Sequence, residues 1–157
     1  MDLNEIQSGS KAFSFESIGD KVTGTIKLVE RRQQTSFENN TPLTWDDGSP
    51  RMLTYVELET DLRDPELDSD DGVRAIYCKG GTFEIAEGSG LSAEAALVDA
   101  AKKAGSKTLD EGAKLAVVFT GKAKSKVRGY QPAKLYTMQY QAAVASVAVS
   151  DLFDDEG

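Results

Sequence analysis

Five segments of the chain carry the apolar and polar patterns that are typical of β-strands. They are residues 21–31, 52–59, 73–79, 114–122 and 133–142. In the fourth of these segments Leu115, Val117 and Phe119 occupy every second position, so we expect their side chains to point into a core. The stretches 33–51 and 61–72 are polar and lack such periodicity, which predicts loops.

Residues 92–105 show helical spacing instead of alternation. Ser92 can cap the N-terminus of a helix, and Gly105 can end it. Lys102 and Lys103 lie in the last turn, where the helix dipole favours cations. The apolar residues expected on the buried stripe are Ala93, Leu97, Ala100, Ala101 and Ala104. Their small side chains suit close packing against the end of a barrel.

The predicted order is therefore three strands, one helix and two further strands. A five-stranded Greek-key barrel of the OB type, with the helix between its third and fourth strands, has this order. We predict an all-β fold with one helix of this kind, formed by residues 1–142. An α+β sandwich of the same elements with a different strand order is the alternative.

The residue types present exclude most common catalytic designs. Histidine is absent and Cys78 is the single cysteine, so the counts rule out disulfides, His-containing triads and ordinary zinc sites. Cys78 lies in a strand-like run and is expected to be a buried small hydrophobe. The acidic run 68–72 lacks the ligand spacing of a calcium loop. We expect no enzymatic activity, no metal and no cofactor.

The chain also lacks the signals of membrane insertion or export. Its hydrophobic share is 39%, and no apolar run approaches the roughly 18 residues that a membrane-spanning helix needs. The first residues carry an acid where a signal peptide has its positive region. We expect a protein that stays in the cytoplasm and has no membrane partner.

Charge is distributed very unevenly. The net charge of −8 is unfavourable for binding nucleic acid, but residues 57–71 hold eight acids and one base. Residues 112–150 contain no acid. The cations of that stretch are Lys114, Lys122, Lys124, Lys126, Arg128 and Lys134. The net charge is therefore a poor guide to any one surface.

The segment after the fourth strand predicts a basic hairpin. If the alternation of that strand continues, its cations face outward, and an aromatic residue lies near the turn at Gly129. The residues of this hairpin that we assign to single-stranded DNA are Lys122, Lys124, Lys126, Arg128, Tyr130 and Lys134. A solvated, charged hairpin is the alternative interpretation.

Two tyrosines and a lysine are expected on the outer face of the second and third strands. If the apolar positions there point inward, Tyr55, Tyr77 and Lys79 point outward. Exposed aromatic rings can stack on any base, which suits binding without sequence preference. The alternative is that one of the two tyrosines belongs to the core.

The loop after the first strand adds further candidates. Trp45 lies in a polar context and either closes over a bound strand or pins the loop to the barrel. Lys27, Arg31 and Arg32 lead into this loop and add cations at that end of the barrel.

With these features the chain resembles the single-stranded DNA-binding proteins of tailed bacteriophages, which are related in architecture to bacterial SSB. The likeness lies in the strand order, the segment GKAKSKVRGYQPAKLY and the ending DLFDDEG. It implies sequence-independent binding of single-stranded DNA in replication or recombination, in the host cytoplasm. It also implies that residues 143–157 form a flexible acidic tail that recruits replication or recombination proteins. The tail residues concerned are Asp151, Leu152, Phe153, Asp154, Asp155 and Glu156.

An acidic regulatory or adaptor protein, which binds another protein through its loop and tail, is the alternative function. The sequence leaves open the oligomeric state, with a homodimer as one possibility, and the preference for DNA or RNA.

Overall fold

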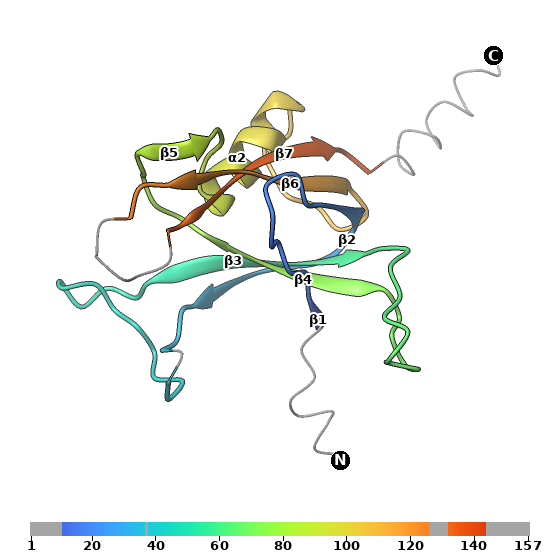
Figure 1. Cartoon of the computed structure of the whole chain (residues 1–157), viewed down its shortest axis with the longest axis horizontal. Coiled ribbons are helices and arrows are strands. Elements are labelled where there is room, and N and C mark those ends of the chain that lie inside the picture. Colours follow the sequence, from blue (N-terminus) through green and yellow to red (C-terminus); the bar gives the residue numbers. More distant parts are fainter. Residues whose placement is uncertain (1–10, 37, 126–131, 144–157) are drawn as a thin grey trace.

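The alternating segments build a mainly β structure with a single helix in the part of the chain that the computed structural model describes, residues 11–36, 38–125 and 132–143 (Figure 1). The elements are β1 (Lys11–Ala12), β2 (Lys21–Gln33), β3 (Met52–Glu59), β4 (Val73–Lys79), β5 (Ile85–Gly88), α2 (Ala93–Lys103), β6 (Lys114–Ala123) and β7 (Lys134–Gln141). The five predicted strands are β2, β3, β4, β6 and β7, with ends that differ from the prediction by no more than two residues.

The predicted count of five strands is wrong, because the described residues contain seven. Both additional strands are short: β1 has two residues and β5 has four, all exposed. Each is held by its pairing with a longer strand. β1 pairs with β4, and β5 pairs with the end of β6. Neither leaves a periodic signal in the sequence.

The strands form one curled, open sheet that resembles half of a barrel (Figure 1). Its order is β1-β4-β3-β2-β6-β5, and β7 pairs with the other edge of β6. All ladders are antiparallel except the one between β1 and β4. In the described part of the chain no ladder joins β4 to β7, so the sheet has an open seam between these two strands.

The helix packs against β7 and β4, and its apolar residues belong to the main core. Ser92 caps it as predicted, its Oγ accepting a hydrogen bond from the amide of Ala95 at 3.3 Å. Its buried residues are Ala93, Ala96, Leu97, Ala100 and Ala101. The predicted stripe is therefore wrong at Ala104, which is exposed because the helix ends at Lys103, and it omitted Ala96. Within the residues described, no helix is long and apolar enough to cross a membrane.

The segment that follows β1 partly fills the open seam. The amide of Phe13 donates to the carbonyl of Ala75 in β4 at 3.1 Å, and the buried Phe15 ring contacts the ring of Tyr136 in β7 at 5.2 Å between centroids. The ammonium of Lys134 donates to the carbonyl of Phe15. The N-terminal segment thus bridges the two strands that do not pair with each other.

Candidate nucleic-acid interface

The outer face of β2, β3 and β4 carries a small cluster of its own, separate from the main core. Leu53, Tyr55 and Ala75 are buried there, with Leu28 packed beside them. Strand register places Tyr55 directly between Glu30 of β2 and Tyr77 of β4.

Tyr55 is fully buried, at 0% exposure, so the expectation that it is an exposed platform is wrong. The guanidinium carbon of Arg32 lies 3.5 Å from its ring centroid, and the ring of Tyr77 packs edge-on at 5.1 Å. Its hydroxyl donates to Glu57 at 2.6 Å. Burial, followed by this hydrogen bond, raises the pKa of Tyr55 to about 12. The ring is a support for its neighbours and is not available for stacking.

Tyr77 lies on the same face, as predicted, and remains 47% exposed. Its strand borders the open seam, so one side of the ring rests on Tyr55 while the other is open to solvent. Lys79, also exposed, follows two residues later on the same face, opposite Leu53. Leu53 also lies opposite Arg32 of β2. Arg32 and Lys79 are therefore the two neighbours of Leu53 on the adjacent strands.

Two cavities adjoin along the seam between β4 and β7. The first, of about 310 Å³, includes Tyr77, Lys79, Phe83, Ser92, Lys134 and Tyr136 in its walls. The second, of about 340 Å³, lies toward the N-terminal segment and includes Phe13 and Phe15. Tyr77, Lys134 and Tyr136 line both cavities and form the partition between them. We call the first cavity the seam slot.

Lys134 does not point outward with the other cations of the predicted hairpin. Its ammonium points into the seam, where it donates to the carbonyl of Phe15 and lies 5.5 Å from the ring centroid of Phe119. The predicted inward residues of β6 are all buried, at 0% exposure: Leu115, Val117 and Phe119.

Lys122 and Lys124 lie beside acids that the sequence analysis did not place there. β5 pairs with the end of β6 and brings Glu87 opposite Lys122, while Lys124 forms an exposed ion pair with Glu84 at 3.3 Å. The remaining hairpin candidates, Lys126, Arg128 and Tyr130, lie outside the described residues.

The described residues of the segment 34–51, which are 34–36 and 38–51, form more structure than a plain loop. Isolated bridges join Thr35 to Pro42 and Thr44 to Pro50, so the chain folds back on itself as an arm that projects beyond the start of β3 (Figure 1). The arm presents Trp45, which is 54% exposed, with the guanidinium of Arg51 at 4.5 Å from its ring centroid. Sequence reasoning missed Arg51, because its stacking on Trp45 depends on the fold of the arm.

The cations at the end of β2 already have partners. Arg31 donates to Glu94 of the helix at 2.5 Å and to Thr54 at 2.9 Å, and Arg32 pairs with Glu30 at 2.6 Å. Lys27 is exposed at a bulge, where the pairing of β2 with β3 shifts register.

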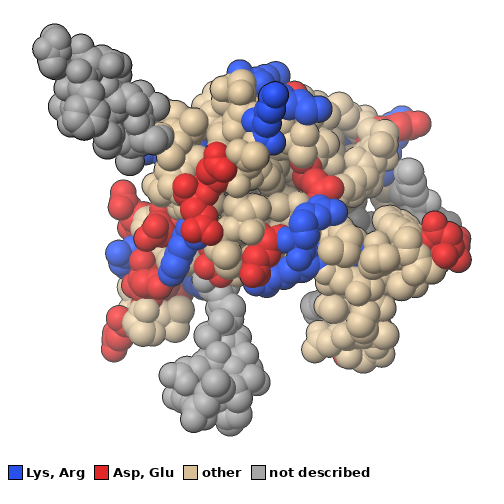
Figure 2. Space-filling view, turned by 180° about the vertical axis from the view of Figure 1, so that it is seen from behind, with Lys and Arg blue, Asp and Glu red and all other residues tan. Residues whose placement is uncertain are grey.

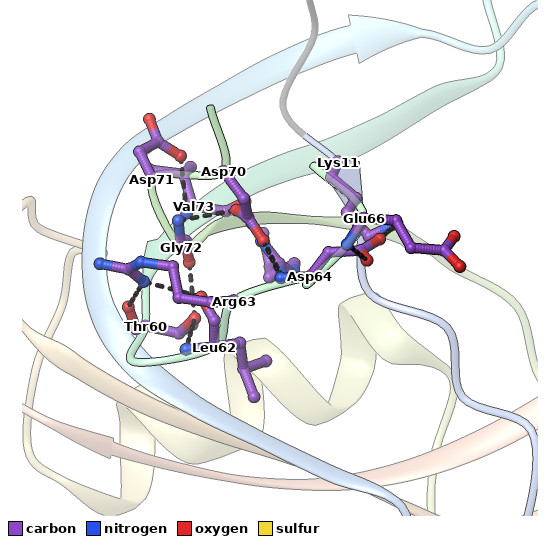
Figure 3. A network of polar contacts seen from close by, with 11 residues as sticks. Lys11, Thr60, Leu62, Arg63, Asp64, Glu66, Asp70, Asp71, Gly72 and Val73 are labelled. Carbon is purple, nitrogen blue, oxygen red and sulfur yellow. Dashed lines mark hydrogen bonds and ion pairs between the residues drawn. The ribbon is translucent and has the colours of Figure 1, made fainter. Parts of the chain in front are cut away.

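The acidic segment 60–72 connects the end of β3 to the start of β4, at the end of the hairpin away from the arm (Figure 3). The carboxylate of Asp70 accepts two hydrogen bonds from Arg74, at 2.7 and 2.9 Å, and both side chains are only 5% exposed. Asp70 also accepts from the amides of Gly72 and Asp64. The Arg74 guanidinium and these amides hold the pKa of Asp70 far below its usual range. Lys11 pairs with Asp64 at 3.4 Å and ties β1 to the loop.

Seen from behind, most acidic side chains cover the half of the molecule that contains this loop (Figure 2). The arm 34–51, on the other side of the same view, is largely uncharged apart from acids toward its outer side. The acidic loop predicted from the sequence thus lies on one side of the molecule. The tail residues 151–157 lie outside the described residues.

Cys78 is buried in the main core, and burial raises its thiol pKa to about 12. Among the described residues no group of three or more Cys, Asp or Glu side chains is arranged to hold a metal ion.

Comparison of the chain with protein-family models, with curated proteins and with solved structures finds no match.

Proposed function

We propose that this protein binds single-stranded DNA without sequence preference, on an OB-type half-barrel. The support from the fold is the spatial order β6-β2-β3-β4, in which the fourth long strand returns to lie beside the first, as in a Greek key. β7 adds the fifth long strand next to β6, and the barrel stays partly open. In this interpretation β1 and β5 are additions to the OB arrangement.

The observation that carries the proposal is a pair of half-exposed aromatic rings, each next to a cation, at the end of the sheet that OB proteins use. Trp45 stacks on Arg51 in the loop after the first long strand. Tyr77 lies on the face of the second and third long strands, near Lys79. Rings that can stack on any base, combined with cations for phosphate, are the usual means of binding a single strand without reading its sequence.

Three ion pairs of the candidate cations can exchange their partners. Arg31–Glu94, Arg32–Glu30 and Lys124–Glu84 are partly exposed, with side-chain exposures between 28% and 77%. Exposed ion pairs contribute only about 0–1 kcal/mol each. A phosphate can therefore replace the carboxylate at little cost, and the release of counterions from the strand favours that exchange.

The acidic loop gives little support to the alternative function, an adaptor that binds another protein. Carboxylates of Asp64, Asp70 and Asp71 accept hydrogen bonds from the backbone of the loop itself, so they serve its folding. We propose that the protein acts in replication or recombination, with the segment 151–157 as the contact for partner proteins.

Titration of fluorescein-labelled oligo-dT at low salt, beside a duplex of the same length, tests the proposal. We expect tight binding of the single strand and weak binding of the duplex. Lys79→Glu should weaken binding of oligo-dT several-fold. Lys107→Glu, the same charge change in the segment between α2 and β6, is the matched control and should bind like the wild type. Equal or absent binding of both nucleic acids would overturn the proposal.

A further inference from the structure

We propose that the seam slot binds a single nucleotide of the bound strand. The base lies among the aromatic rings of the slot, and the phosphate lies toward Lys79 and Lys134. This inference rests on the proposed function and adds to it a defined site that lies in the seam between β4 and β7, beside the outer face of the sheet.

The size of the slot fits one nucleotide and not a run of them. Its volume of about 310 Å³ is at the lower end of the roughly 300–1,000 Å³ of small-molecule sites. Tyr77, Lys134 and Tyr136 separate it from the second cavity, where Phe13 and Phe15 occupy the seam. The slot therefore has room for a base turned out of the strand or for a nucleotide at its end.

The walls provide the two chemistries that a nucleotide needs. Tyr77, Phe83 and Tyr136 supply aromatic surface from three different segments of the chain. Lys79 and Lys134 line the slot from the two strands beside the seam, and the ammonium of Lys134 also donates to the carbonyl of Phe15. The N-terminus of α2, at Ser92 and Ala93, also lines the slot, and the helix dipole adds to the attraction of an anion there.

Phe83 is placed over the slot by its glycine neighbour. Gly81 has φ +144°, and a Cβ at this position would lie 2.6 Å from the Phe83 ring. The positive φ favours glycine at this position, and the absence of a Cβ leaves room for the ring beside the backbone. The ring of Phe83 thus lies against Gly81 and forms one wall of the slot, although Phe83 belongs to no strand or helix.

The test uses the full chain and three probes: dTMP, thymidine and inorganic phosphate. NMR amide shifts should show that dTMP perturbs Gly80, Phe83 and Ala93, that thymidine does so more weakly, and that phosphate alone has little effect. Phe83→Ala should abolish the dTMP shifts and weaken oligo-dT binding by about 5- to 150-fold, the range for loss of one stacked base. Phe83→Tyr, which keeps a ring, should restore both.

Trp45→Ala is the matched control, because it removes a ring from the arm and none from the slot. It should weaken oligo-dT binding and leave the dTMP shifts unchanged. Lys79→Gln, at an exposed position, gives a second variant that does not depend on the packing of Phe83. If oligo-dT binds but dTMP shifts none of the slot amides, and Phe83→Ala binds oligo-dT like the wild type, the slot proposal is wrong while the proposed function stands. If oligo-dT itself does not bind, the proposed function fails.

Discussion

An arginine–carboxylate pair lies at each end of the β3–β4 hairpin, one at its acidic loop and one on β2 opposite the start of β3, and the two pairs differ in burial. At the acidic end Arg74 and Asp70 are each 5% exposed and meet through two hydrogen bonds. At the other end Arg32 and Glu30 are 42% and 44% exposed. A buried pair cannot lose one partner without leaving an isolated charge, whereas an exposed pair can exchange one anion for another. The first therefore belongs to the fold, and the second remains available for a ligand.

The largest expected effect is at the buried pair. Asp70→Asn leaves the Arg74 guanidinium buried without a counter-charge, which should lower the free energy of unfolding by about 3–5 kcal/mol. Asp68→Asn, on the exposed surface of the same loop, is the control and should change it by less than about 0.5 kcal/mol. Urea denaturation measures both. A small effect of Asp70→Asn would mean that the two ends of the hairpin do not differ as described.

The same pair should make the protein sensitive to acid. The pKa of Asp70 is lowered in the folded state, so its contribution to stability is fully present above the unfolded-state value of about 3.9 and is lost as the pH falls below it. Between about pH 5 and pH 2 the free energy of unfolding should therefore fall more steeply for Asp68→Asn, which keeps the Asp70–Arg74 pair, than for Asp70→Asn, which lacks it. Parallel curves would assign the acid sensitivity to other carboxylates.

The neighbouring tyrosines should respond to substitution in opposite ways. Tyr55→Ala removes a fully buried ring that contacts Arg32 and Tyr77, and should cost about 3–5 kcal/mol of stability. Tyr77→Ala should leave stability nearly unchanged and weaken binding of oligo-dT by about 1–3 kcal/mol. Thermal unfolding and fluorescence titration distinguish the two. Lost stability with normal affinity for Tyr77→Ala would place that ring in the core.

The smallest change is expected for charge removal in the hairpin. With about three to five phosphates neutralised, the log–log salt dependence of oligo-dT binding should have a slope near −2 to −4 in the wild type. Replacing Lys122, Lys124, Lys126 and Arg128 by glutamine should make it shallower. Because Glu84 and Glu87 lie beside the first two of these lysines, we expect the slope to fall by about one to two units instead of the roughly three that four phosphate contacts would contribute. An unchanged slope would remove the hairpin from the electrostatic contact.

The long strands and the helix could be predicted from the sequence because their patterns are local. Alternation in Met52–Glu59 and Val73–Lys79 gave the observed bounds, and Ser92 gave the start of the helix. β5 could not be predicted, since its four exposed residues are held only by pairing with β6.

The site was harder to predict than the fold. The alternation of inward and outward positions placed Tyr55 and Tyr77 on the correct face. The burial of Tyr55, however, depends on Arg32 from another strand. The seam slot combines Phe83 from a loop with Tyr136 from β7, and no single stretch of sequence carries a signal for such a combination. The alternation of β7, with Met138 and Tyr140 buried, was the one available sign that Tyr136 faces inward.

The bridge across the open seam has a consequence for how the protein is made. Phe15 and Lys134 are 119 residues apart in sequence, so the first half of this contact leaves the ribosome long before the second. At about 5–20 residues per second the interval is roughly 6–24 seconds. During that time Phe13 and Phe15 have no strand β7 to pack against and are available to chaperones or to other nascent chains. The slot between β4 and β7 comes into existence only with the last strand, so a nascent chain that stops before residue 134 lacks it altogether.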